Sequence, residues 1–100
     1  MDVVYSVNHV PIRLTEERWH HIVFNKPYME RYREKILSSV EKPDRVLQGY
    51  AGALIAVLSV ARHKYLHVVY REVSSNDGFI ITAFVSPKVN KRLSVWPRKY

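Results

Sequence analysis

The sequence predicts an α+β domain in which two helices near the N-terminus, preceded by a small hairpin, pack on one face of a four- to five-stranded antiparallel sheet. Helical periodicity is confined to residues 15–41, and alternating apolar segments follow from residue 45 onward. A run of helices followed by a run of strands is typical of this class. The chain has 100 residues, enough for one hydrophobic core. We therefore expect a single domain over residues 1–100.

The N-terminal half predicts a hairpin and two helices. Two short apolar segments, 3–6 and 10–13, flank Asn8 and His9 and indicate the hairpin. Thr15 precedes two glutamates, as an N-cap does, so the first helix is expected to start there and to end near Phe24. Pro27 opens a second helix over roughly 28–41, where apolar residues recur at helical spacing.

Five strands are expected after the helices. The segments are short and apolar or alternating, with turn residues at Gly49, Gly52 and Asn76-Asp77-Gly78. The expected strands are Arg45–Tyr50, Ala53–Leu58, Tyr65–Val73, Phe79–Val85 and Leu93–Trp96.

Alternation also predicts the register of the hairpin around residues 76–78. If Leu66, Val68 and Tyr70 share the core face with Phe79, Ile81, Ala83 and Val85, then Val68 and Ala83 lie on one face, and Arg71 and Thr82 lie on the other. A three-residue loop at 76–78 would instead place Thr82 beside Glu72. The alternation is the stronger signal, because a slip of one residue reverses every side chain of a strand.

The charge is positive and unevenly distributed. The net charge is +7, and residues 62–100 contain eight Lys or Arg against only Glu72 and Asp77. A charged run such as 88–99 can be a solvated face or tail, but here its cations alternate with apolar residues, as in a strand that presents cations to a polyanion. The chain has no cysteine, which excludes disulfide frameworks, thiolate zinc sites and cysteine nucleophiles. The first residues lack the features of a secretory signal, and no apolar run is long enough for a membrane span, so we expect a cytoplasmic protein without a membrane partner.

The chemistry-bearing residues favour RNA as the polyanion. The sequence has no metal-ligand motif, phosphate loop, nucleophile elbow or dinucleotide fingerprint, so we expect no metal and no cofactor. His21 should point away from the core, because it lies about 200° around the helix from Trp19. Metal-free RNA cleavage needs a proton acceptor, a proton donor and cations, which His, Lys and Arg supply. A surface histidine without function is the plainer alternative for His21.

Four segments of the chain resemble the small phage and toxin-type nucleases of the barnase, EndoU, colicin and RelE superfamily. The resemblance rests on Pro11–Thr15 leading into Trp19-His20-His21-Ile22, on Lys26-Pro27-Tyr28-Met29, on Leu66–Glu72 and on Gly78–Ala83. Each motif is short, but their order and spacing cover nearly the whole chain. The resemblance implies two helices against an antiparallel sheet, with an RNA cleft on the open sheet face.

The resemblance also implies a catalytic set. The family's histidine corresponds to His21, its strand arginine to Arg71, and its threonine to Thr82. The residue before the proline is often histidine in the family, and here it is Lys26, which can neutralise a phosphate or act as a general acid. Glu72 would orient Arg71 or accept a proton. RNA would run along a path lined by Lys64, His67, Lys88, Lys91 and Arg92.

The sequence thus predicts a metal-independent endoribonuclease, the toxin of a toxin–antitoxin pair or a phage-derived relative, acting on tRNA or mRNA. Two alternatives remain open. The chain could be an RNA-binding module without catalysis, with Tyr65, Tyr70, Phe84 and Trp96 as stacking surfaces or, more plainly, as core residues. It could also be a protein-interaction domain whose basic face binds an acidic partner such as a cognate antitoxin.

Overall fold

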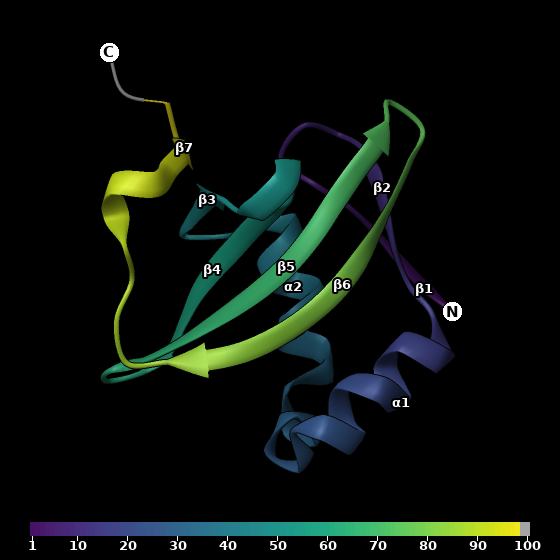
Figure 1. Cartoon of the computed structure of the whole chain (residues 1–100), viewed down its shortest axis with the longest axis vertical. Helices are drawn as coiled ribbons and strands as arrows, with labels where there is room; N and C mark the ends of the chain where they lie inside the picture. Colours follow the sequence, from purple (N-terminus) through teal and green to yellow (C-terminus); the bar gives the residue numbers. More distant parts are fainter. Residues whose placement is uncertain (99–100) are drawn as a thin grey trace.

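A seven-stranded mixed sheet forms the body of the protein, of which the computed structural model describes residues 1–98. The strand order is β1-β2-β6-β5-β4-β3-β7 (Figure 1). The longest strands, β4 to β6, form a central antiparallel meander. The strands span Asp2–Tyr5 (β1), Pro11–Leu14 (β2), Arg45–Gln48 (β3), Leu54–Ala61 (β4), Lys64–Ser74 (β5), Asp77–Ser86 (β6) and Ser94–Trp96 (β7).

The predicted fold class was wrong in strand number, pairing and order. The sheet has seven strands instead of four or five, and the two helices lie in the middle of the chain, after β1 and β2. The predicted hairpin exists, but it is part of the main sheet, because β2 pairs in parallel with β6 through Ile12 opposite Gly78 and Arg13 opposite Phe79. Arg13 Nη2 also lies 2.8 Å from Asp77 Oδ1. Alternation within a short segment does not reveal such a distant parallel partner.

The helical region follows its local signals. Helix α1 spans Glu16–Asn25, and its N-cap Thr15 accepts a hydrogen bond from the Arg18 backbone N–H. The second predicted helix is split into a 3₁₀ segment, η1 (Pro27–Tyr32), and the α-helix α2 (Arg33–Glu41). The two helices and the sheet share one core, to which α1 contributes Trp19 and Ile22, α2 contributes Ile36 and Val40, and the sheet contributes Ile12, Leu66, Val68, Tyr70, Ile80 and Ala83. The sheet face turned toward the helices is therefore the core face.

Arg33 connects the start of the chain to both helices. Its Nη2 lies 2.8 Å from Asp2 Oδ2 and 2.7 Å from Glu16 Oε1. Its guanidinium also lies 5.0 Å from the centre of a Trp19 ring. The hydrogen bond from Arg33, and then its positive charge, lower the pKa of Glu16. These contacts hold β1, α1 and α2 in place around the end of the core.

A bulge at Ile81 changes the register between β5 and β6 partway along the hairpin. Val68 is paired with Ala83 and Val69 with Thr82, so Val68 and Ala83 share a face, as the alternation predicts. Ile81 has no partner on β5, so the register shifts by one toward the turn of the hairpin. Tyr70 is therefore opposite Ile80, and Arg71 is opposite Phe79. The predicted core positions of Phe79 and Ile81 were therefore wrong, and Ile80 occupies the core instead. Arg71 and Thr82 still share a face, because β5 alternates normally through Val69 and direct partners point to the same side.

The outer face, opposite the helices, is partly covered by two other segments. A short 3₁₀ turn, η2 (Tyr50–Gly52), connects β3 to β4. After β6 the chain runs through η3 (Lys91–Leu93) into β7, which pairs with β3 at the sheet edge. Figure 1 shows α2 behind the sheet and the C-terminal segment along one side of it. Within residues 1–98, no helix has the length and apolar character needed to cross a membrane.

Candidate nucleic-acid interface

The centre of the outer face presents one row of side chains from each of two neighbouring strands. Strand β5 contributes His67, Val69 and Arg71, and β6 contributes Thr82 and Phe84. His67 is paired with Phe84, and Val69 with Thr82. We call these five residues the outer strip. It combines an imidazole, a guanidinium and a hydroxyl with apolar and aromatic surface.

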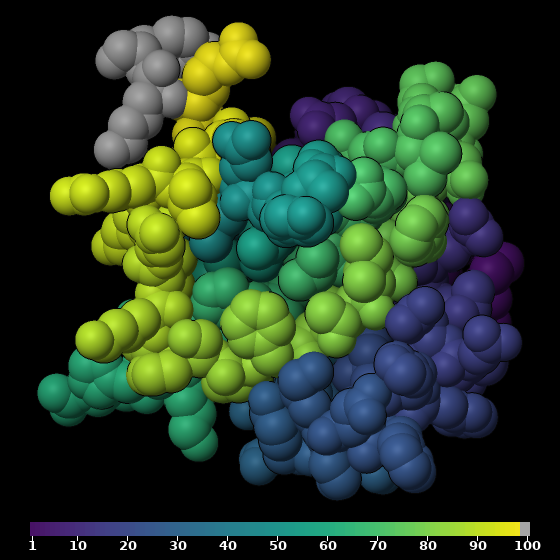
Figure 2. Space-filling view, in the orientation of Figure 1, coloured from purple at the N-terminus to yellow at the C-terminus, as the bar shows by residue number. Residues whose placement is uncertain are grey.

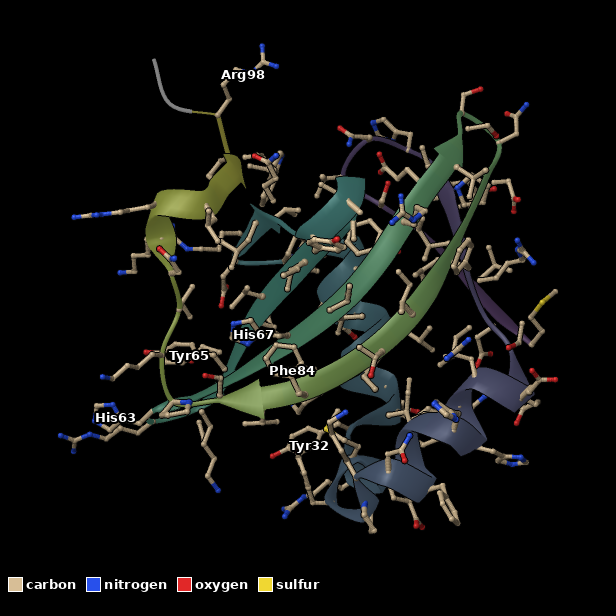
Figure 3. The ribbon with its side chains drawn as sticks, viewed as in Figure 1. Tyr32, His63, Tyr65, His67, Phe84 and Arg98 are labelled. Atoms are coloured by element: carbon tan, nitrogen blue, oxygen red, sulfur yellow. The ribbon has the colours of Figure 1, made fainter. Side chains whose placement is uncertain are left out.

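His67 is fixed within the outer strip by stacking and by a hydrogen bond. Its ring lies 4.8 Å from the ring of Phe84, at an interplanar angle of 15° (Figure 3). Its Nδ1 is 2.9 Å from the Tyr65 carbonyl oxygen. A carbonyl only accepts hydrogen bonds, so Nδ1 carries the proton, and in the neutral ring Nε2 is an acceptor. His67 is only 5% exposed, so the packing holds the ring in this orientation.

Arg71 is the cation of the outer strip. Its side chain is half-buried, and no Asp or Glu within residues 1–98 forms a salt bridge with it. Its Nη1 lies 3.4 Å from the point that a Cβ on Gly52 would occupy, so the guanidinium extends beneath η2. An unpaired guanidinium on the same sheet face as Thr82 and His67 is a good ligand for a phosphate.

Glu72 does not orient Arg71. The two residues are neighbours on β5 and therefore point to opposite faces. The Glu72 carboxylate instead accepts a hydrogen bond of 2.5 Å from Ser6 Oγ and one of 3.0 Å from Asn8 Nδ2. Its role in the structure is to hold the β1–β2 turn against the end of β5.

His21 and Lys26 lie apart from the outer strip. His21 is exposed on α1, as predicted, and its Nε2 is 3.1 Å from Asn25 Nδ2. It lines an open hollow of about 580 Å³ formed by α1 side chains alone. Lys26 is half-buried at the end of α1, where its backbone N–H donates to the Ile22 carbonyl. The predicted catalytic residues therefore fall into three places: α1 and its end, the outer strip, and the opposite face at Glu72.

A basic groove adjoins the outer strip. Two neighbouring cavities, of about 450 Å³ and 420 Å³, lie between β3 and residues 87–98 and share Asp44, Arg45 and Lys91 in their walls. We call them together the C-terminal groove. The Asp44 carboxylate in these walls already has a partner within the chain, because its Oδ2 accepts a hydrogen bond from the Ser59 N–H. The cations in the walls are Arg45, Lys88, Lys91, Arg92 and Arg98. In Figure 2 the C-terminal segment, in yellow, borders the visible face.

Three of the five predicted RNA-binding residues line the C-terminal groove: Lys88, Lys91 and Arg92. His67 lies on the outer strip. Lys64 is separate, since it lines a hollow with Tyr28, Arg31, Tyr32 and Val85.

Arg45 is a groove residue that was not predicted from the sequence. Arg45 Nη1 donates a 2.9 Å hydrogen bond to Ser94 Oγ, which joins the two walls. No local pattern marks this residue, because its partner is far away along the chain. Of the four aromatics considered for stacking, Tyr70 is buried in the core, Phe84 is on the outer strip, and Tyr65 lines the groove. Trp96 belongs to the edge strand β7.

The structure offers no candidate metal site within residues 1–98. No three His, Asp or Glu side chains in this part of the chain come close enough together to hold a metal ion. No family model, curated protein or solved structure matches the chain. The outer strip and the C-terminal groove are therefore interpreted from their own chemistry.

Proposed function

We propose that this protein is a metal-independent endoribonuclease that binds RNA along the C-terminal groove and the outer strip. The proposal rests on one observation: Arg71 has no carboxylate partner within residues 1–98 and shares a sheet face with Thr82 and with His67, whose Nε2 is left as an acceptor. This set offers a base, a phosphate ligand and a hydroxyl donor.

The reaction follows from these roles. His67 Nε2 takes the proton from a ribose 2′-hydroxyl, and the 2′ oxygen attacks the adjacent phosphorus. Arg71 stabilises the negative charge that develops on the phosphoryl oxygens, and Thr82 donates a hydrogen bond to one of them. The bond to the 5′ oxygen breaks, leaving a 2′,3′-cyclic phosphate, and the leaving oxygen takes a proton from water. His67 replaces His21 as the base in this scheme, because His21 has no contact with the outer strip.

Cleavage is tested by incubating total RNA with the protein in EDTA and analysing the products for 2′,3′-cyclic phosphate ends. We expect Arg71→Ala and His67→Gln to lower the rate by about 100-fold or more. His20→Ala is the control, since His20 is an exposed α1 histidine outside the outer strip. Thermal unfolding verifies that each variant is folded. An inactive wild type, or full activity in Arg71→Ala, would contradict the proposal. A loss confined to His21→Ala would place the reaction on α1.

A second candidate is RNA binding without cleavage. It is favoured by the C-terminal groove, which collects five cations, whereas the residues expected to be catalytic lie in three separate places. In this case RNA stays intact after long incubation but binds with strong salt dependence. In either case the protein would act in the cytoplasm on tRNA or mRNA. The same cations would receive an acidic antitoxin, as in a toxin–antitoxin pair.

A further inference from the structure

The 3₁₀ turn η2 presents an aromatic side chain to solvent. Tyr50 is 93% exposed, the highest value among the exposed large hydrophobic residues of the described chain, 1–98. The turn beneath it is held by two backbone hydrogen bonds, from Gly49 N to Ala53 O at 2.8 Å and from Ala53 N to Tyr50 O at 3.0 Å. Tyr50 therefore has a fixed backbone and a free ring.

The backbone of this turn is strained. Ala51 has a φ of 52° and a ψ of 40°, in the left-handed region that disfavours residues with a Cβ. Gly49 is also constrained, because a Cβ there would lie 3.0 Å from the Ala53 carbonyl oxygen. Such strain concentrates at ligand-binding positions, where the surrounding structure maintains it. Here the strained residue directly follows the exposed Tyr50.

The η2 turn lies beside Arg71, the proposed phosphate-binding residue of the outer strip. The guanidinium of Arg71 reaches beneath Gly52, two residues after Tyr50. In Figure 2 the teal atoms of this part of the chain stand out from the visible face, next to the green atoms of β5 and β6. The turn that carries the exposed ring of Tyr50 thus adjoins the unpaired guanidinium of Arg71.

We propose that Tyr50 is a base-stacking residue, and that its ring receives an unpaired nucleobase while Arg71 holds a neighbouring phosphate. This inference rests on the proposed action on RNA, and it specifies the substrate class as single-stranded RNA. A base within a duplex is already stacked on both faces, whereas an unpaired base has a face free for an aromatic side chain. At 93% exposure, the ring of Tyr50 is accessible to such a base.

The test measures the affinity of the full chain for a short single-stranded RNA with 2′-O-methyl groups, which cannot be cleaved, by fluorescence anisotropy. Tyr50→Ala should weaken binding about fivefold or more, whereas Tyr50→Phe and Tyr50→Trp keep affinity within about twofold. An abasic strand of the same length and charge should bind Tyr50→Ala and wild type equally. Tyr5→Ala is the matched control, because Tyr5 is an exposed tyrosine on the edge strand β1.

A second readout detects the stack itself. A 2-aminopurine base in the strand should lose fluorescence when wild type binds and should recover it at saturating Tyr50→Ala. Equal affinity of Tyr50→Ala and wild type for the normal strand would overturn the role of Tyr50 and leave RNA binding intact. An equal loss for the abasic strand would also overturn it. If wild type bound neither strand, this inference and the proposed function would both fall.

Discussion

Tyr70 carries the only side-chain oxygen within residues 1–98 that is fully buried without a hydrogen-bond partner. Its ring fills the centre of the core at 0% exposure, on the face of β5 opposite Arg71. A buried hydroxyl without a partner loses its hydration and gains nothing in return, at a cost of about 1–3 kcal/mol. The contribution of Tyr70 to stability comes from its ring and not from its hydroxyl.

We therefore predict that Tyr70→Phe keeps or raises the free energy of unfolding, by up to about 1 kcal/mol, in urea titrations at pH 7. The variant should also resist alkaline unfolding better. Burial, and then the charge of Glu72, raise the pKa of Tyr70 in the folded state. The unfolded chain ionises first, so wild-type stability is fully present below pH of about 10 and falls as the pH rises further. Tyr5→Phe is the exposed control, and a clear loss of stability in Tyr70→Phe would reveal a hydrogen bond to its hydroxyl.

Single-residue roles were predictable where a local rule governs them. The outward direction of His21 follows from helical spacing, and the N-cap role of Thr15 follows from the residues after it. The role of Glu72 was not predictable, because its partners Ser6 and Asn8 are 66 and 64 residues away. The same limit applies to His67, whose orientation depends on the stacked ring of Phe84 on the next strand.

At the scale of elements, the bulge at Ile81 determines which side chains of β6 reach the outer face. Alternation correctly placed Val68 and Ala83 on one face, whereas the three-residue loop that would place Thr82 beside Glu72 does not form, because Glu72 is opposite Gly78. Alternation alone does not show that one residue must be extra, because a bulge is determined by packing on both sides of the sheet. The parallel pairing of β2 with β6 was missed for the same reason.

Gly78 makes that parallel pairing possible. A Cβ at this position would lie 2.5 Å from Ile12 Cδ1 and 2.6 Å from the Arg71 carbonyl oxygen. We predict that Gly78→Ala lowers the free energy of unfolding by about 1–3 kcal/mol, because β2 and the end of β5 must move apart. It should also weaken RNA binding, since Arg71 moves with its backbone. Ser75→Ala, in the exposed turn of the same hairpin, should change neither property. An unperturbed Gly78→Ala would show that β2 is loosely attached.

At the scale of the whole molecule, the excess positive charge is concentrated in the segment after β6, at the sheet edge that β7 forms. Residues 87–98 contain Lys88, Lys91, Arg92 and Arg98 without any acidic residue. The acidic residues near the helices are partly neutralised, as at Glu16 and Asp2, which both contact Arg33. The sequence correctly located the excess charge after residue 61, but the groove that collects it needs Arg45 from β3 as its second wall.

The C-terminal groove should therefore set the salt dependence of RNA binding. Each cation that contacts a phosphate releases counterions, so the logarithm of the binding constant falls with the logarithm of salt concentration by about 0.7 per contact on a single strand. We predict that Lys91→Ala and Arg92→Ala each reduce this slope by about 0.7 to 1, and that the double variant reduces it about twice as much. Lys35→Ala is the matched control, because Lys35 is an exposed cation on α2, which packs against the core face. Anisotropy titrations over a range of salt concentrations give each slope directly. If the slope is unchanged in the double variant but falls in Lys35→Ala, then RNA binds on the helix side and not in the C-terminal groove.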